Sequence, residues 1–126
     1  MLVAAELPEI QVSHMIILKI AFIFGLVSIG VLSLLPQEAL PDTGISDKLE
    51  HLAAYATLCL IGQYAFDSQV RRLATGLFLY GVLLEGLQSL VPGRYPSLAD
   101  IVANSLGVGI GYLYFVLKSR SREKTF

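Results

Sequence analysis

Four apolar stretches, each about as long as a membrane is thick, constrain the fold of this chain more than any other feature. They run approximately over residues 15–35, 48–66, 73–91 and 98–117. The hydrocarbon layer of a bilayer is about 30 Å thick and needs about 20 helical residues to cross it. Because backbone polar groups find no water in lipid, spanning segments of this kind must be helices. We therefore expect an all-α protein, a bundle of four transmembrane helices.

The connections between these stretches are too short to hold a separate soluble domain. The longest, residues 36–47, contains Pro36, Pro41 and Gly44, which favour turns. We predict a short N-terminal arm over residues 1–13, one membrane domain over residues 14–118 and a basic tail over residues 119–126. The composition agrees, because charged residues make up 15% of the chain and a soluble domain carries about 25%.

The distribution of positive charge predicts that both termini are cytoplasmic. In that orientation seven of the nine Lys and Arg residues lie inside, namely Lys19, Arg71, Arg72, Lys118, Arg120, Arg122 and Lys124. Lys48 and Arg94 then lie outside, and the reverse topology would export the larger group. The basic C-terminal residues directly follow an apolar span, so we interpret them as a cytoplasmic anchor and expect no nucleic-acid partner.

A set of polar side chains, here called the polar layer, interrupts three of the apolar stretches at one depth. Its members are Asp47, Lys48, His51, Glu85, Gln88, Asp100 and Asn104. At a rise of about 1.5 Å per residue, the deeper members lie about 6 to 10 Å from the outer ends of their helices. An ionised side chain costs about 2.5 to 3.5 kcal/mol at the centre of a membrane helix. We therefore expect these groups to converge on one outward-facing polar site and not to face lipid.

Small residues support this inward placement. Gly107 and Gly111 continue the stripe of Asp100 and Asn104, and their G-x-x-x-G spacing lets a neighbouring helix approach closely. Arg94 lies in the loop between the third and fourth stretches, from which we expect it to fold over the polar layer as a cationic lid.

The residue types predict candidate roles. Histidine and acidic groups in a shared, partly dehydrated site are suited to general acid and base chemistry. The candidates for that role are His51, Glu85 and Asp100. Two cations at this depth are suited to holding a phosphate or carboxylate, and polar neighbours are suited to orienting a ligand. The candidates for ligand binding are Asp47, Lys48, Tyr55, Gln88, Arg94 and Asn104.

Structural interpretations of the same residues stay open. Asp47 and Glu50 fit a capping box at the start of a helix, and Ser97 with Asp100 fits the same pattern. Gln88 and Asn104 are equally suited to hydrogen bonds between helices. The acids and His51 offer ligands for a divalent ion, but the chain has no H-E-x-x-H motif or cysteine pair. We therefore expect no metal or cofactor and keep a divalent ion as the weaker alternative.

The order and spacing of these motifs resemble the VanZ-like family, which is named for a protein associated with teicoplanin resistance. The resemblance rests on Asp47-Lys48-x-x-His51-x-x-x-Tyr55, Glu85-x-x-Gln88, Arg94 and Asp100-x-x-x-Asn104-x-x-Gly107, and it covers roughly residues 30 to 117. It implies a small multi-pass protein of the bacterial cytoplasmic membrane. It implies no particular reaction, substrate or oligomeric state.

Three functions are compatible with these features. The first is an outward-facing site that binds or modifies the head group of a membrane lipid or a lipid-linked cell-wall precursor. The second is a structural or partner-binding protein whose polar layer joins the helices by hydrogen bonds. The third is a transporter or channel, which we rank last because the inner halves of the spans carry almost no polar residues apart from Gln63.

Overall fold

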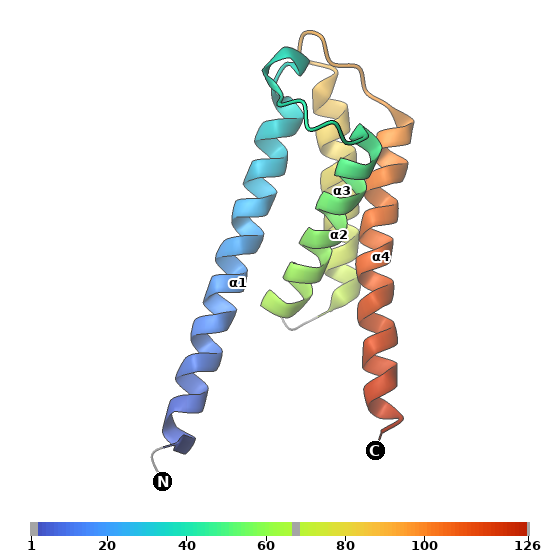
Figure 1. Cartoon of the computed structure of the whole chain (residues 1–126). Helices are drawn as coiled ribbons and strands as arrows, with labels where there is room; N and C mark the ends of the chain where they lie inside the picture. Colours follow the sequence, from blue (N-terminus) through green and yellow to red (C-terminus); the bar gives the residue numbers. More distant parts are fainter. Residues whose placement is uncertain (1–2, 67–68, 126) are drawn as a thin grey trace.

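The computed structural model describes residues 3–66 and 69–125, and within them the chain is all-α (Figure 1). Four α-helices and one short 3-10 helix, η1, follow one another along the chain. Their bounds are α1 Val3–Leu34, η1 Gln37–Ala39, α2 Asp47–Ala65, α3 Val70–Gln88 and α4 Leu98–Glu123. Each of the four apolar stretches forms one helix, so the prediction of an all-α, four-helix protein is confirmed.

The ends of the helices are set by residues that cannot continue them. Pro36 lies two residues after the end of α1, and Gly44 and Gly93 adopt positive φ angles of 70° and 79° in the loops before α2 and α4. Residues that carry a β-carbon rarely adopt this backbone conformation. These turns bring the start of α2 beside the end of α1 and the start of α4 beside the end of α3 (Figure 1).

The predicted capping boxes are wrong. Ser46, not Asp47, is the residue before the first turn of α2, and neither Ser46 nor Ser97 makes a side-chain capping hydrogen bond. Glu50 instead accepts a hydrogen bond from the Thr43 hydroxyl in the preceding loop. Asp47 and Asp100 therefore have carboxylates that are not used to cap their helices.

The closest helix pair is α2 with α4, and glycine makes it possible. A β-carbon placed on Gly107 would lie 2.3 Å from the carbonyl oxygen of Leu52, and one on Gly111 would lie 2.7 Å from Cβ of Cys59. Both distances are far inside van der Waals contact, so only glycine allows this approach. The prediction that the glycine stripe of α4 faces a neighbouring helix is confirmed, and Cys59 is a fully buried packing residue.

Helix α1 is packed more loosely than the others. It contacts α2 and α3, chiefly through Phe22 and neighbouring apolar residues, and it diverges from the bundle toward its N-terminus (Figure 1). Its outer face exposes large apolar side chains such as Phe24, which is 72% exposed. An apolar surface of this kind is suited to contact with acyl chains.

Two of the helices have the length and composition of membrane spans among the residues described. They are residues 9–34 of α1 and residues 98–123 of α4. Helices α2 and α3 each have 19 residues, which at 1.5 Å per residue gives about 28 Å, but they carry more polar groups. The N-terminal end of α1 and the C-terminal end of α4 lie at the same end of the bundle (Figure 1). Their predicted placement in the cytoplasm stays a prediction.

The limits predicted for the terminal segments do not coincide with helix ends. Residues 3–13 form the first turns of α1, and α4 continues as a helix through Glu123 of the basic tail. Residues 1, 2 and 126 lie outside the described part of the chain.

Candidate functional site

Five members of the polar layer meet where the N-terminal ends of α2 and α4 lie side by side. Asp47, Lys48 and His51 come from the first two turns of α2, and Asp100 and Asn104 come from the first two turns of α4. The close approach at Gly107, one turn further along α4, brings these two sets of side chains within hydrogen-bonding reach.

Lys48 joins the two helices electrostatically. Its ammonium group forms an ion pair with the Asp100 carboxylate and lies 3.8 Å from Oδ2 of Asp47. The Asp100 side chain is 10% exposed, whereas those of Lys48 and Asp47 are about half exposed. A buried carboxylate is costly unless it is paired, so Lys48 compensates the charge of Asp100.

His51 lies between an amide and a carboxylate. Its Nδ1 is 2.8 Å from Oδ1 of Asn104, and its Nε2 is 3.7 Å from Oδ1 of Asp47. An amide oxygen only accepts hydrogen bonds, so with this Asn104 orientation Nδ1 carries a proton. In a neutral imidazole Nε2 is then the basic nitrogen, and it faces Asp47. Asn104 therefore orients the ring and leaves Nε2 available for proton exchange.

Glu85 is buried at the C-terminal end of α3, with 3% of its surface exposed. Its Oε1 accepts a hydrogen bond of 2.6 Å from the backbone N–H of Ser97, which immediately precedes α4. It is close enough to interact electrostatically with Asp100, His51 and Lys48. Glu85 thus points into protein and not into lipid, and its hydrogen bond holds the start of α4 against α3.

Gln88 and Arg94 bind the C-terminal end of α1. Gln88 Nε2 donates to the carbonyl oxygen of Ser33 at 3.0 Å. Arg94 donates from Nε to the carbonyl of Leu35 at 2.9 Å and from Nη2 to that of Leu32 at 2.8 Å. The last carbonyls of a helix have no partners within it, and a cation near them is favourable.

The expected lid over the polar layer is therefore a misassignment. The guanidinium of Arg94 also donates to Oε1 of Gln37 at 3.1 Å, so three of its nitrogens bind α1 and η1. It does not cover the pair of Lys48 and Asp100. The last turn of α1 has no basic residue of its own. In the sequence, this absence is the feature that is compatible with a cation from another segment binding the end of α1.

A cavity of about 290 Å³ lies between the end of α1, the η1 loop and the start of α2. Its apolar lining comes mainly from α1 and the loop. Its polar lining comprises Ser33, Gln37, Thr43, Asp47, Glu50, His51, Tyr55, Gln88 and Arg94. This volume is at the lower end of the range for small-molecule sites, about 300 to 1,000 Å³. His51 thus has Asn104 on one side and this cavity on the other.

Tyr55 forms the floor of the site. It is 1% exposed and lines the cavity. Its hydroxyl and the amide of Asn104 both lie just over 3 Å from the position that a β-carbon on Gly81 would take. Gly81 of α3 therefore makes room for both side chains at the centre of the bundle.

Apart from Tyr55, the structure places the predicted residues in three groups. Asp47, Lys48, His51, Asp100 and Asn104 form one hydrogen-bonded and ion-paired cluster between α2 and α4. Gln88 and Arg94 lie on the opposite wall of the cavity, toward α1, and Glu85 lies at the junction of α3 and α4. The catalytic and binding roles assigned to these residues stay predictions.

The contribution of α1 was missed. Ser33 of α1 and Gln37 of η1 line the cavity, as does Glu50 of α2, for which the sequence indicates only a capping role. The first apolar stretch has no polar residue near its end except Ser33, so its sequence gives almost no signal. The loop that contains η1 lines the cavity because of the conformation it adopts, and this conformation cannot be derived from its sequence pattern.

Asp47, His51 and Asp100 also offer a possible metal site among the described residues, since one ligand atom of each lies within 4.8 Å of the others. The ammonium group of Lys48 contacts both carboxylates. It already supplies positive charge to this position, so a divalent ion would have to displace it. Oxygen and imidazole ligands suit such an ion, but the lysine makes the set a poor fit for one.

Comparison with known proteins gives one match. A family model described as VanZ/LLP1 matches residues 8–119, which is most of the chain and includes every residue of the cluster and the cavity. No curated protein and no solved structure matches the chain.

Proposed function

The chain belongs to the VanZ/LLP1 family and is a membrane protein, and from this premise we propose that it binds the head group of a lipid or lipid-linked cell-envelope precursor. The head group occupies the cavity between α1, the η1 loop and α2, on the outer side of the membrane. The distribution of Lys and Arg along the chain supports this orientation.

The position of His51 is the observation that carries the proposal. Its ring is oriented by Asn104, and it lines a cavity beside the carboxylate of Asp47. A histidine held by one neighbour and facing a binding site with the other nitrogen has the arrangement of a general acid or base. His51 Nε2 is therefore placed to accept a proton from a bound hydroxyl or ammonium group.

The charges around the cavity favour a head group that donates hydrogen bonds. Asp47 and Glu50 are both on its wall, whereas Lys48 is not and Arg94 is already bound to α1. The pair of Lys48 and Arg94, which was expected to hold a phosphate, is thus not free to do so. Hydroxyl or amino groups, as on a sugar or an amino alcohol, match carboxylate and imidazole acceptors better than a phosphate does.

The test is a comparison of histidine variants in a bacterium that depends on the protein for glycopeptide tolerance. His51→Ala and His51→Gln should lower teicoplanin tolerance or change the membrane lipid composition at equal protein abundance. His14→Gln is the matched control, because His14 lies on an exposed face of α1 away from the cavity. If the His51 variants behave like the His14 variant in both assays, this site is not the functional one.

A structural role is the second candidate, and specific contacts favour it. Glu85, Gln88 and Arg94 all bind backbone groups of neighbouring helices. On this alternative, His51→Gln lowers the midpoint of thermal unfolding in detergent in proportion to any loss of tolerance. A variant that unfolds at the wild-type temperature and yet loses tolerance excludes the structural role as the sole function.

A further inference from the structure

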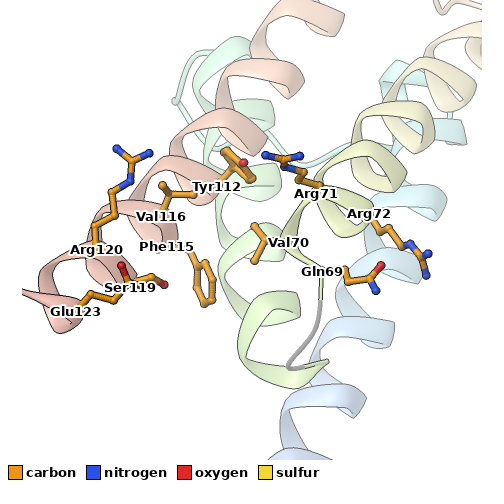
Figure 2. Close-up of a pocket in the computed structure, with 10 residues that line it drawn as sticks. All are labelled: Gln69, Val70, Arg71, Arg72, Tyr112, Phe115, Val116, Ser119, Arg120 and Glu123. Atoms are coloured by element: carbon orange, nitrogen blue, oxygen red, sulfur yellow. The ribbon is translucent and has the colours of Figure 1, made fainter.

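A second cavity lies at the opposite end of the bundle, where α3 begins and α4 ends. It is a groove of about 610 Å³ between the start of α3 and the end of α4 (Figure 2). Its floor is apolar and aromatic, with Val70 from α3 and Tyr112, Phe115 and Val116 from α4. Its rim carries Arg71, Arg72 and Arg120 and a single carboxylate, Glu123.

We propose that this groove binds the head group and upper acyl chain of an anionic phospholipid. The two parts of the groove match the two parts of such a molecule. The arginines match a phosphate, and the apolar floor matches the first methylene groups of a chain. Figure 2 shows Arg71 directed across the groove toward Tyr112, with Phe115 and Val70 below them between the helices.

None of these arginines forms an ion pair within the part of the chain that is described. Every ion pair found there involves Lys48, His51, Asp47 or Asp100 at the other end of the bundle, and none involves Arg71, Arg72 or Arg120. The first turn of α3 also has no acidic residue and no side-chain cap. Since the start of a helix favours anions, Arg71, which points into the groove from that position, makes the site more attractive to a phosphate.

An adjoining hollow extends the groove and is lined in part by a buried glutamine. It has a volume of about 200 Å³, shares Phe115 and Ser119 with the groove, and is also lined by Gln63. Gln63 is 5% exposed, and its Nε2 donates to the carbonyl of Gly111 at 3.2 Å. Its Oε1 has no partner among the described residues.

The surroundings favour a lipid over a protein segment. The groove flanks α4, which has the composition of a membrane span, and it lies where that span ends in basic residues. Basic pockets between membrane helices at the cytoplasmic surface are suited to anionic lipid head groups. Acyl chains are present at this depth in the bilayer, whereas a peptide would have to displace them. This site lies apart from the polar layer and does not depend on the function proposed for it.

The test measures lipid binding to the full-length protein in detergent by native mass spectrometry, with phosphatidylglycerol against phosphatidylcholine. Wild type should prefer phosphatidylglycerol, and inorganic phosphate alone should not compete at equal concentration. Each of Arg71→Gln and Arg120→Gln should weaken phosphatidylglycerol binding about fivefold, the factor expected for one basic residue at a membrane surface. Lys124→Gln removes a charge from the same end outside the groove and should have a smaller effect.

A second pair of variants tests the groove without removing an arginine. Ser119→Asp places a carboxylate in the groove, and Ser121→Asp places the same charge two residues further along α4, outside it. Only Ser119→Asp should abolish the preference for phosphatidylglycerol. Equal effects of the two aspartates, equal effects of Arg71→Gln and Lys124→Gln, or no preference in wild type would each overturn the proposal. If the two aspartates have equal effects, a protein segment would be the remaining candidate occupant of the groove.

Discussion

The substitution Gly107→Ala should separate α2 from α4 and disturb the polar layer from a distance. The added methyl group would lie 2.3 Å from the Leu52 carbonyl oxygen and 3.0 Å from the Ala56 nitrogen. Both are backbone atoms of α2, so no side-chain rotation can relieve the clash. To reach an ordinary contact of 3.4 Å, the helices must move apart by about 1 Å.

The cost follows from that movement. Overpacking of a tightly packed interior costs about 1 to 3 kcal/mol, and we expect about 2 kcal/mol because backbone atoms are involved. The shift would also stretch the hydrogen bond of 2.8 Å between His51 and Asn104, which lies one turn from Gly107. Alanine has a better helix propensity than glycine by about 1 kcal/mol in water. The measured loss of unfolding free energy is therefore the cost of the clash minus any gain in helix propensity.

Gly109 provides the control on the same helix. A β-carbon there would meet nothing within 4 Å, so Gly109→Ala gains the same helix propensity without a clash. The assay is reversible unfolding of both variants in mixed detergent micelles, followed by circular dichroism. We expect Gly107→Ala to be destabilised and Gly109→Ala to equal or exceed wild type. Equal stabilities of the two variants would refute the close approach of α2 and α4.

Two further predictions concern polar contacts. Arg94→Gln should lower the midpoint of thermal unfolding, because two carbonyls at the end of α1 lose their donor. Arg94→Lys should restore only part of this stability, since lysine keeps the charge but not the forked geometry. Full rescue of the unfolding midpoint by lysine would contradict this reasoning. In a double-mutant cycle, Lys48→Met and Asp100→Asn should show a coupling free energy of about 1 kcal/mol, a modest value because Lys48 is half exposed. Strictly additive effects would show that the ion pair does not contribute to stability.

The helices and the packing face of α4 could be predicted because both depend on local patterns, whereas the identity of α2 as the partner of that face could not. Apolar runs that end at Pro36 and near Pro92 define helices, and the spacing of Gly107 and Gly111 defines a face. The depth of the polar residues follows from helical rise alone. These features need no knowledge of how distant segments meet.

The contacts of Arg94 and Glu85 could not be predicted, because they depend on loop conformation. Arg94 reaches α1 only because the α3–α4 loop turns at Gly93, where φ is positive, and places its side chain beside Leu35. Glu85 accepts from Ser97 because the same loop returns to the end of α3. The spacing of these residues along the chain is compatible with many such geometries, and only the folded loop selects one.

The type of partner separates the polar residues into two groups. Glu85, Gln88 and Arg94 bind backbone groups that would otherwise lack partners where helices end, and in lipid such unpaired groups are costly. The positions of these three side chains are therefore accounted for by structure. His51 and Asp47 bind other side chains and line a cavity, and the helix ends do not require them there. We infer that Glu85 is a positioning residue for α4, so Glu85→Gln, whose side-chain oxygen can still accept from Ser97, should be milder than His51→Gln in the teicoplanin assay. If Glu85→Gln lowers tolerance more than His51→Gln, Glu85 takes part in proton transfer and is not only a positioning residue.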